Sequence, residues 1–196
     1  MTAPVVISDV AEIAAPSPKV SGGVRFAPLG TALPTDATTP LDAAFVTLGR
    51  VKDDGIRRTE DRAQSKVYDW GGNTIAILQT QFGITITFDL LQVMNADVQR
   101  AAHGEDNVDV IPADATTGTT IAAKINPTLL DTGVWVFDSY YQKMSGRLVL
   151  PYARPTKVDG PTWTHKEIAS FKITLESMPD NDNNHAYEYW CDGVLL

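Results

Sequence analysis

Apolar and polar side chains alternate along several short stretches of the chain. Residues 84–90 read Ile-Thr-Ile-Thr-Phe-Asp-Leu, and residues 171–176 repeat this alternation. Period-two alternation places the apolar side chains on one face of a half-buried β-strand. Residues 74–80 are also rich in strand-forming side chains. Further strands are predicted at residues 44–51, 64–70, 107–112, 119–125, 133–141, 146–152 and 186–192. This many strands predicts a mainly β chain that folds as an antiparallel β-sandwich or barrel.

One short α-helix is predicted beside the sheet, at about residues 95–104. Asn95 is a typical N-cap, Asp97 suits the positive end of the helix dipole, and Gly104 provides a C-terminal stop. Small apolar side chains that begin with Val98 fall on one face. A helix of this length is marginal alone, so we expect that face to dock on the sheet.

The first 40 residues have a different pattern, because they contain six of the twelve prolines of the chain. Proline lacks a backbone donor and has a fixed φ, which disfavours both helix interiors and central strands. We therefore predict an extended N-terminal arm over residues 1–43, followed by a single domain over residues 44–196. The alternative for residues 1–18 is a partly disordered terminus.

Basic and acidic side chains are interspersed over residues 50–66. Mixed signs weaken such a cluster as a phosphate site and suit salt bridges to another protein surface. The stretch 52–69 is predicted to be an exposed, protruding loop or a long hairpin, and loops of this length are uncommon unless functional. The side chains expected to contact another subunit are Asp54, Arg57, Arg58, Glu60 and Arg62.

The amino-acid composition limits the classes of function that the chain can have. The 196 residues, 43% hydrophobic and 20% charged, are typical of one soluble globular domain. The net charge of −8 opposes tight binding to a phosphate backbone. No run approaches the roughly 18 apolar residues that a membrane span needs, so no membrane partner is expected.

No motif for catalysis or for metal binding stands out. Residues 180–184 resemble the opening of a calcium loop, but His185 and Cys191 occupy the positions that need glycine and a bidentate glutamate. A polar turn is the preferred interpretation. The single cysteine cannot form an internal disulfide, and the three histidines lack zinc-ligand spacing. We therefore expect no enzymatic activity, no metal and no cofactor.

Several segments of the sequence resemble a known family. Residues 23–36, 41–51 and 53–56 are similar to the N-terminal region of major tail tube proteins from long, flexible-tailed bacteriophages. The likeness continues through Tyr68-Asp69-Trp70-Gly71-Gly72 and the strand at 84–91. It is dense over about residues 22–104 and diffuse after that.

The resemblance implies a β-sandwich or barrel subunit of the phage tail tube type with a flanking helix. Such subunits form hexameric rings that stack into a hollow tube for ejection of the genome. It implies ring-to-ring contacts from the arm at residues 1–43, the loop at 52–69 and the C-terminal segment at 177–196. In the arm, the implied contact residues are Phe26, Pro28, Leu29, Leu33 and Pro34.

The resemblance also implies partners and a location. The partners would be further copies of the chain and the tape measure, tail terminator and tail tip proteins, in a virion assembled in the host cytoplasm. Phage DNA would pass through the lumen without specific binding. Residues 67–142 carry nine acidic and two basic side chains, which makes them a candidate source of a DNA-repelling lining. The candidate lumen-lining acids are Asp69, Asp89, Asp109, Asp131 and Asp138.

Two other interpretations stay open. One is a β-sandwich binding or adhesin module, with Trp135, Tyr140, Tyr141 and Trp163 as its ligand platform. The other is a second tail protein of the same fold, such as a tail-end cap.

Overall fold

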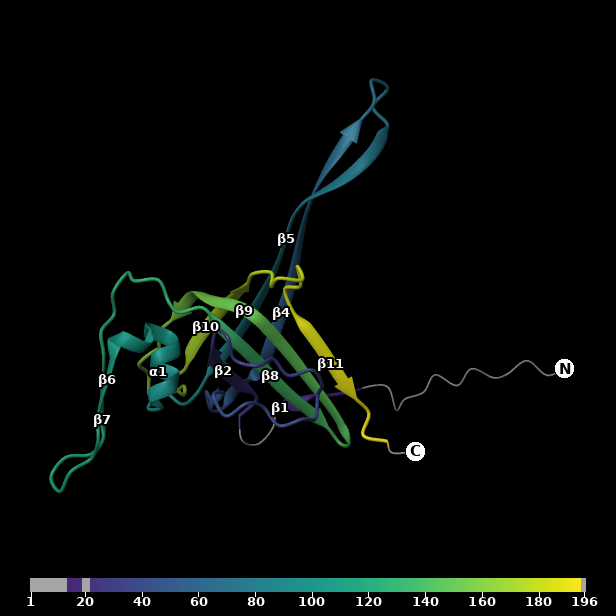
Figure 1. Cartoon of the computed structure of the whole chain (residues 1–196). Helices are drawn as coiled ribbons and strands as arrows, with labels where there is room; N and C mark the ends of the chain where they lie inside the picture. Colours follow the sequence, from purple (N-terminus) through teal and green to yellow (C-terminus); the bar gives the residue numbers. More distant parts are fainter. Residues whose placement is uncertain (1–13, 19–21, 195–196) are drawn as a thin grey trace.

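The chain is mainly β and antiparallel, with one short α-helix among the residues described, as the sequence predicts (Figure 1). The computed structural model describes residues 14–18 and 22–194. In chain order the elements are β1 (Ser17–Pro18), β2 (Val24–Pro28), β3 (Val46–Thr47), β4 (Val51–Tyr68), β5 (Thr74–Leu90), α1 (Ala96–His103), the 3-10 turn η2 (Glu105–Asn107), β6 (Val108–Ile111), β7 (Thr120–Ala123), β8 (Gly133–Tyr141), β9 (Met144–Asp159), β10 (Phe171–Ser177) and β11 (Tyr187–Cys191). No helix within these residues is both long enough and apolar enough to cross a bilayer.

One curled sheet forms the body of the molecule. Its strand order is β3-β2-β8-β9-β10-β5-β4, with β1 also paired to β8 and β11 to β9. The two outermost strands, β3 and β4, are consecutive in sequence and are joined by residues 48–50. Because so short a link spans at most about 14 Å, the sheet must bend until its edges approach each other. The result is a partly closed barrel.

The inside of this barrel is the main hydrophobic core. Ile84, Ile86, Phe88 and Leu90 are all buried on the inner face of β5, as their alternation predicts. The Phe88 ring lies 5.4 Å from the ring of Phe137 on β8, although two strands separate β5 from β8 in the sheet. Such a contact requires the sheet to wrap around its own contents.

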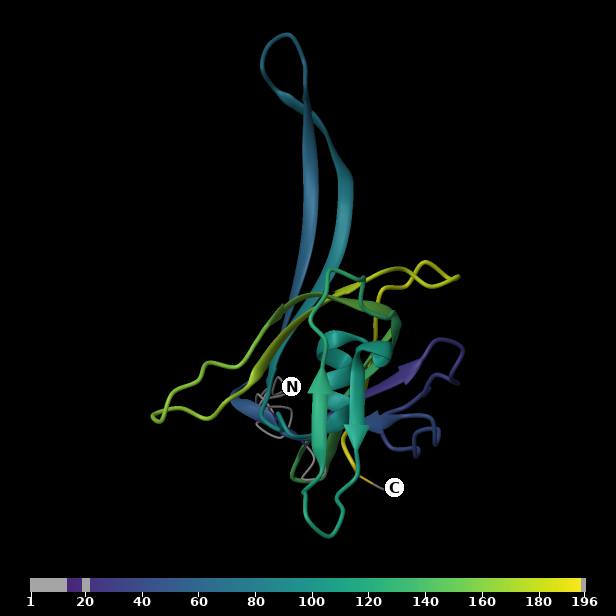
Figure 2. The same ribbon diagram turned by 90° about the vertical axis from the view of Figure 1, so that its left-hand side faces the viewer.

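Helix α1 packs against the core of this barrel through one face. The Asn95 side chain accepts a hydrogen bond from the backbone N–H of Asp97, and Gly104 follows the helix with φ +95°. Val98 and Ala102 are buried in the core, so the predicted docking face is confirmed. The small β6–β7 hairpin forms a second sheet that lies beside α1 (Figure 2).

A buried ion pair ties the loop between β2 and β3 to the outer face of the sheet. Asp138 and Arg147 lie opposite each other on β8 and β9, and both side chains are 2% exposed. Arg147 Nε donates to Asp138 Oδ1 over 2.7 Å. Its Nη1 also donates to the backbone carbonyls of Asp36 and Thr39, each over 2.9 Å. The loop is therefore anchored through one guanidinium.

The boundary predicted for the N-terminal arm is wrong in part. Residues 24–28 form β2, an interior strand of the sheet paired with β8 and β3, so the domain does not begin at residue 44. The sequence signal misled because Pro28 sits at the last position of β2, where proline is tolerated. Residues 1–13 and 19–21 of the predicted arm lie outside the described residues.

Residues 52–68 of the predicted loop or long hairpin are strand, and Asp69 lies in the turn that follows. Residues 51–68 make the single long strand β4, which pairs along β5 with irregularities near Gly55, Gln64 and Tyr68. Within the predicted C-terminal segment 177–196, β11 pairs with β9 of the same chain.

The buried ion pair yields a stability prediction. We expect Arg147→Met to lower the free energy of unfolding by about 3–5 kcal/mol, because it leaves the Asp138 carboxylate buried without its partner. Lys157→Met breaks an exposed pair with Asp159 on the same strand and should cost less than about 1 kcal/mol. Urea denaturation of dilute protein, followed by circular dichroism, measures both. Equal losses in the two variants would contradict this role for Arg147.

Candidate assembly surfaces

The β4–β5 hairpin projects far beyond the barrel (Figure 1). Residues 84–90 of β5 pair with β10, whereas residues 74–83 pair only with β4. Ten residues of extended strand, at about 3.3 Å each, reach roughly 33 Å. The outer half of the hairpin is therefore a two-stranded ribbon with no third strand.

The end of this ribbon is apolar and exposed. Trp70, in the connecting turn, has a relative exposure of 104%. Ile75 and Ile77 lie on one face of the ribbon, and Val67 and Leu78 lie on the other; all four are exposed. A free two-stranded ribbon is marginally stable at best, and grouped exposed apolar side chains mark interaction sites. We call residues 67–78 the hairpin tip.

Hydrogen bonds organise the turn that carries Trp70. Asp69 Oδ1 accepts from the backbone N–H of Asn73 over 2.7 Å, and Asp69 Oδ2 accepts from Asn73 Nδ2 over 3.1 Å. These bonds, the backbone one first, hold the pKa of Asp69 below its usual value. Gly72 adopts φ +84°, which favours glycine. Trp70 is thus presented outward by an ordered turn.

The charged side chains predicted on the loop lie along β4, and several are paired within the chain. Arg58 Nη1 donates to Glu188 Oε2 on β11; this hydrogen bond raises the pKa of Arg58 and lowers that of Glu188. Arg62 pairs with Glu60 and lies over the ring of Phe82.

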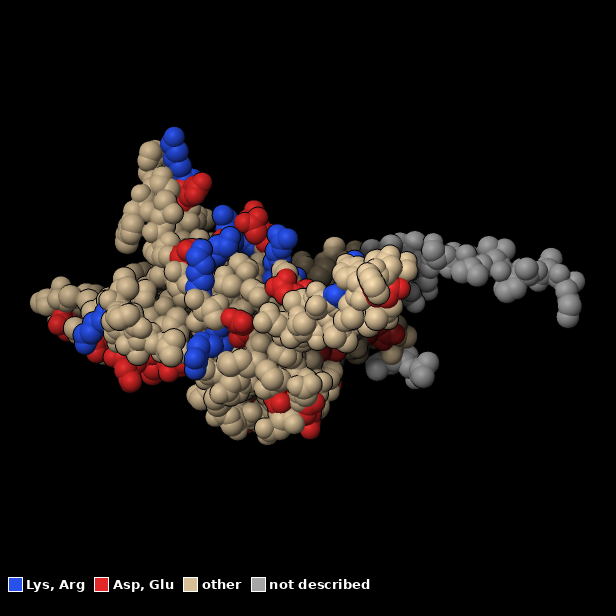
Figure 3. Space-filling view, turned by 90° about the horizontal axis from the view of Figure 1, so that it is seen from above, with Lys and Arg blue, Asp and Glu red and all other residues tan. Residues whose placement is uncertain are grey.

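The two remaining loop residues lie at other points of β4. Asp54 is 4.0 Å from Lys52, and Arg57 is exposed. Seen from above, basic and acidic side chains are interspersed over this face of the molecule (Figure 3). That these five charged residues contact another subunit stays a prediction.

Five residues were expected to form the contact made by the N-terminal arm, and the structure divides them into two groups. The Phe26 ring lies on β2, 5.0 Å from the ring of Trp135, and packs against the core of its own chain, so it is not part of an extended arm. Leu29 and Leu33 are exposed in the loop after β2, beside Pro28 and the half-buried Pro34. These four stay predicted contact residues.

The predicted lumen-lining acids are not brought together. Asp69 lies at the hairpin tip, Asp89 on the outer side of β5, and Asp109 in an ion pair with Lys124 on the β6–β7 hairpin. Asp131 accepts a hydrogen bond from the backbone N–H of Glu105.

Asp138 is not exposed and cannot line a lumen. Its carboxylate is buried against Arg147, so the prediction that it lines a lumen is wrong. One group of exposed acidic side chains follows the edge that carries α1, β6 and β7, and others are spread over the rest of this face (Figure 3).

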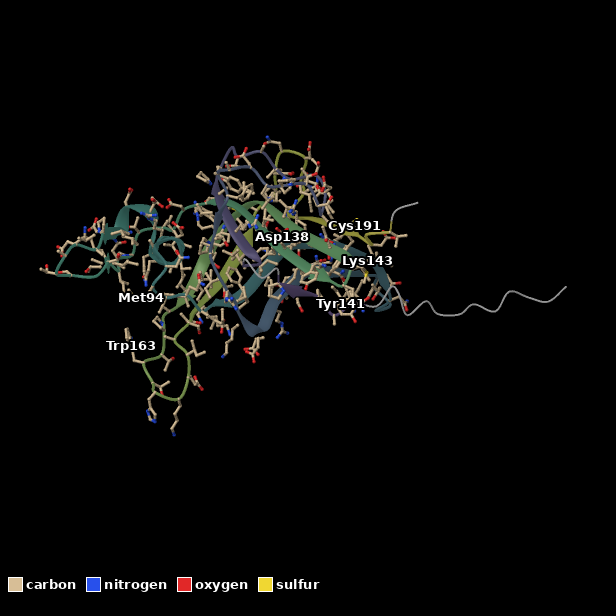
Figure 4. All side chains as sticks on the ribbon, turned by 90° about the horizontal axis from the view of Figure 1, so that it is seen from below. Met94, Asp138, Tyr141, Lys143, Trp163 and Cys191 are labelled. Carbon is tan, nitrogen blue, oxygen red and sulfur yellow. The ribbon has the colours of Figure 1, made fainter. Side chains whose placement is uncertain are left out.

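A cavity of about 600 Å³ is lined by the start of β4 and by residues beside the β8–β9 turn, which lies away from the hairpin tip in Figure 1. We call it the base cavity. It is bounded by β1, the start of β4, and parts of β8, β9 and β11. Viewed from this side, Tyr141, Lys143 and Cys191 lie close together beside it, where the β8–β9 turn meets the end of β11 (Figure 4). Apolar side chains in its wall are Pro18, Val51, Ile56, Phe137, Leu148 and Trp190.

The aromatic platform of the binding-module interpretation does not form. Trp135 is fully buried in the core, whereas Trp163 is 91% exposed on the β9–β10 connection. Figure 4 shows Trp163 near Met94 and far from Tyr141. Because its members face different surroundings, they do not make one ligand surface.

Residues 180–184 form a polar turn, as the sequence predicts, and not the start of a calcium loop. Asp180 accepts hydrogen bonds from the backbone N–H groups of Asp182 and Asn184 and from the Tyr187 hydroxyl. These bonds hold the pKa of Asp180 below its usual value. Across the part of the chain that is described, no three His, Cys, Asp or Glu side chains are grouped as metal ligands.

Sequence reasoning missed both the hairpin tip and the base cavity. The tip had a local signal, since Trp70 precedes a glycine pair and a run of apolar residues that starts at Ile75. The cavity had none, because its walls come from five strands that only the fold brings together.

Comparison with known proteins gives only remote similarity. No family model matches the chain, and no curated protein matches its sequence. Among solved structures, it is similar to the tube-terminating cap of the anti-feeding prophage, with a TM-score of 0.45, 12% identity, and coverage of 94% of this chain and 100% of the other. It is also similar to a chain from the extended sheath–tube complex of the PVC extracellular contractile injection system, with a TM-score of 0.39, 12% identity, and coverage of 94% and 98%. At these TM-scores neither likeness carries an argument about function.

The isolation of the hairpin tip yields a prediction. Replacing residues 63–81 by Asn-Gly joins the directly paired Arg62 and Phe82 through a two-residue turn. We expect the shortened chain to keep its free energy of unfolding within about 1 kcal/mol, because the removed residues are all exposed and pair with no other strand among the described residues. Urea denaturation at low protein concentration measures this. A loss comparable to that of a core substitution would show that the ribbon supports its own barrel.

Proposed function

We propose that the chain is a structural protein of a phage-type tail, and specifically the major tail tube subunit. Six copies would form a ring, and rings would stack into a hollow tube for ejection of phage DNA. The observation that carries the proposal is the hairpin tip, an ordered apolar ribbon that the subunit cannot cover itself. The resemblance of the hairpin sequence, Tyr68 to Gly72 included, to tail tube proteins supports it.

The hairpin tip and the base cavity lie at opposite ends of the folded subunit, and this arrangement favours head-to-tail contacts between subunits. Heterologous contacts produce rings where the rotation closes and filaments where it does not. A tube uses both, within and between rings. A binding module needs neither, and its proposed platform is dispersed over buried and exposed positions.

The charge of the chain is compatible with passage of DNA. A net charge of −8 disfavours release of counterions from phosphates onto the tube wall, so the DNA would slide without specific binding. We propose a virion location after assembly in the host cytoplasm, with tape measure, tail terminator and tail tip proteins as partners. No enzymatic role is part of the proposal.

The proposal predicts assembly that depends on concentration. Purified chain should be monomeric when dilute and should form rings and then stacked tubes as its concentration rises, visible by negative-stain electron microscopy. The chain shortened at residues 63–81 is the matched control and should not form tubes. A wild-type chain that stays monomeric up to millimolar concentration would contradict the proposed function.

A further inference from the structure

The hairpin tip and the base cavity are two unfilled features of opposite shape. One is a convex apolar projection that ends in Trp70, and the other is a concave space of about 600 Å³. In Figure 1 the tip lies above the barrel and the β8–β9 turn lies below it, and Ser139 and Gly146 beside this turn line the cavity. The tip therefore cannot reach the cavity of its own chain.

The walls of the base cavity suit an aromatic side chain. Phe137, Leu148 and Trp190 contribute apolar surface, and Ile56 adds to it from β4. Asp53 and Asp54 line the cavity as well, and Asp54 is well exposed. A tryptophan is amphipathic, with a large apolar ring and one N–H donor that needs an acceptor when buried. Apolar walls with carboxylates among them meet both needs.

The hairpin tip has the matching properties. The Trp70 indole is fully exposed at the end of an ordered turn, so no contact within the subunit is lost when it is inserted elsewhere. The cavity is large enough for the indole together with part of the turn. The ribbon behind it extends about 33 Å from the barrel, which is enough to reach across to a neighbouring subunit.

We propose that the Trp70 turn of one copy inserts into the base cavity of a second copy in the adjacent ring. This inference rests on the proposed function and names the surface that receives the hairpin. Each copy offers one tip and one base cavity, so the contact repeats without closing and extends the assembly along one axis. The occupant of the cavity is thus a sister chain and not a small ligand.

Cross-linking tests which surface receives the tip. Thr74→Cys places a thiol at the hairpin tip, and Lys52→Cys places one among the cavity-lining residues, in a Cys191→Ser background that has no other cysteine. A short bis-maleimide added to assembled protein should give a ladder of covalent oligomers. The control pair combines Thr74→Cys with Thr119→Cys on the β6–β7 connection, and it should give no ladder.

Substitution of the inserted side chain provides the second measurement. Trp70→Ala should raise the protein concentration needed for tubes at least about tenfold, because a large aromatic surface is no longer buried at each contact. Its free energy of unfolding should be unchanged, since none of the described residues covers the indole. Trp163→Ala removes a comparably exposed indole elsewhere and should leave the tip-to-cavity ladder intact.

The outcomes separate this inference from the proposed function. Tubes that form without the tip-to-cavity ladder, or with equal ladders from both cysteine pairs, would overturn the insertion and leave the tube function standing. Tubes of Trp70→Ala at the wild-type concentration would do the same. Absence of rings and tubes at every concentration would overturn both.

Discussion

A two-stranded β-ribbon has no second layer, so it cannot bury the side chains on either of its faces. This constraint governs the outer half of the β4–β5 hairpin, where Ile75 and Ile77 face one side and Val67 and Leu78 the other. Burial of such a surface is worth about 25 cal/mol per Å² of apolar area, and no other described part of the chain buries it here. In the proposed assembly, the hairpin tip is therefore stabilised only when copies of the chain meet.

The barrel gives the ribbon a fixed direction. Residues 84–90 are held between β4 and β10, and their inner side chains are locked in the core. The Arg58–Glu188 pair adds a link from the lower part of β4 to β11. Because the base of the ribbon is fixed at several points, the copies of the proposed tube would present the tip in one direction. A regular repeat of one contact requires this uniformity, whereas a loosely attached apolar segment favours irregular aggregation.

Local patterns predicted the parts of the fold that local chemistry determines. The strand over residues 84–90 and the capping residues Asn95 and Gly104 all lie where the sequence placed them. Long-range pairing decided the rest. Residues 24–28 are a strand because β8 and β3 flank them, which proline content alone argued against.

The errors at the site have the same origin. Asp138 was predicted to line a lumen because its own strand gives no sign of Arg147, which faces it from the neighbouring strand. The polar residues of β4 predicted a loop as readily as a strand, since no side chain of its outer half is buried in the barrel. Sequence patterns that depend on burial therefore do not predict exposed ribbons, or cavities whose walls come from several strands.

Hydrogen–deuterium exchange of the hairpin amides tests most directly whether the tip is completed by other copies. In dilute monomer, backbone amides of Ile75, Ile77 and Leu78 should exchange rapidly, because a ribbon without neighbours opens easily. On assembly, their exchange should slow by an order of magnitude or more, while the amides of β5 inside the barrel change little. Equal and strong protection of the tip in the dilute monomer and in the assembled state would contradict the claim.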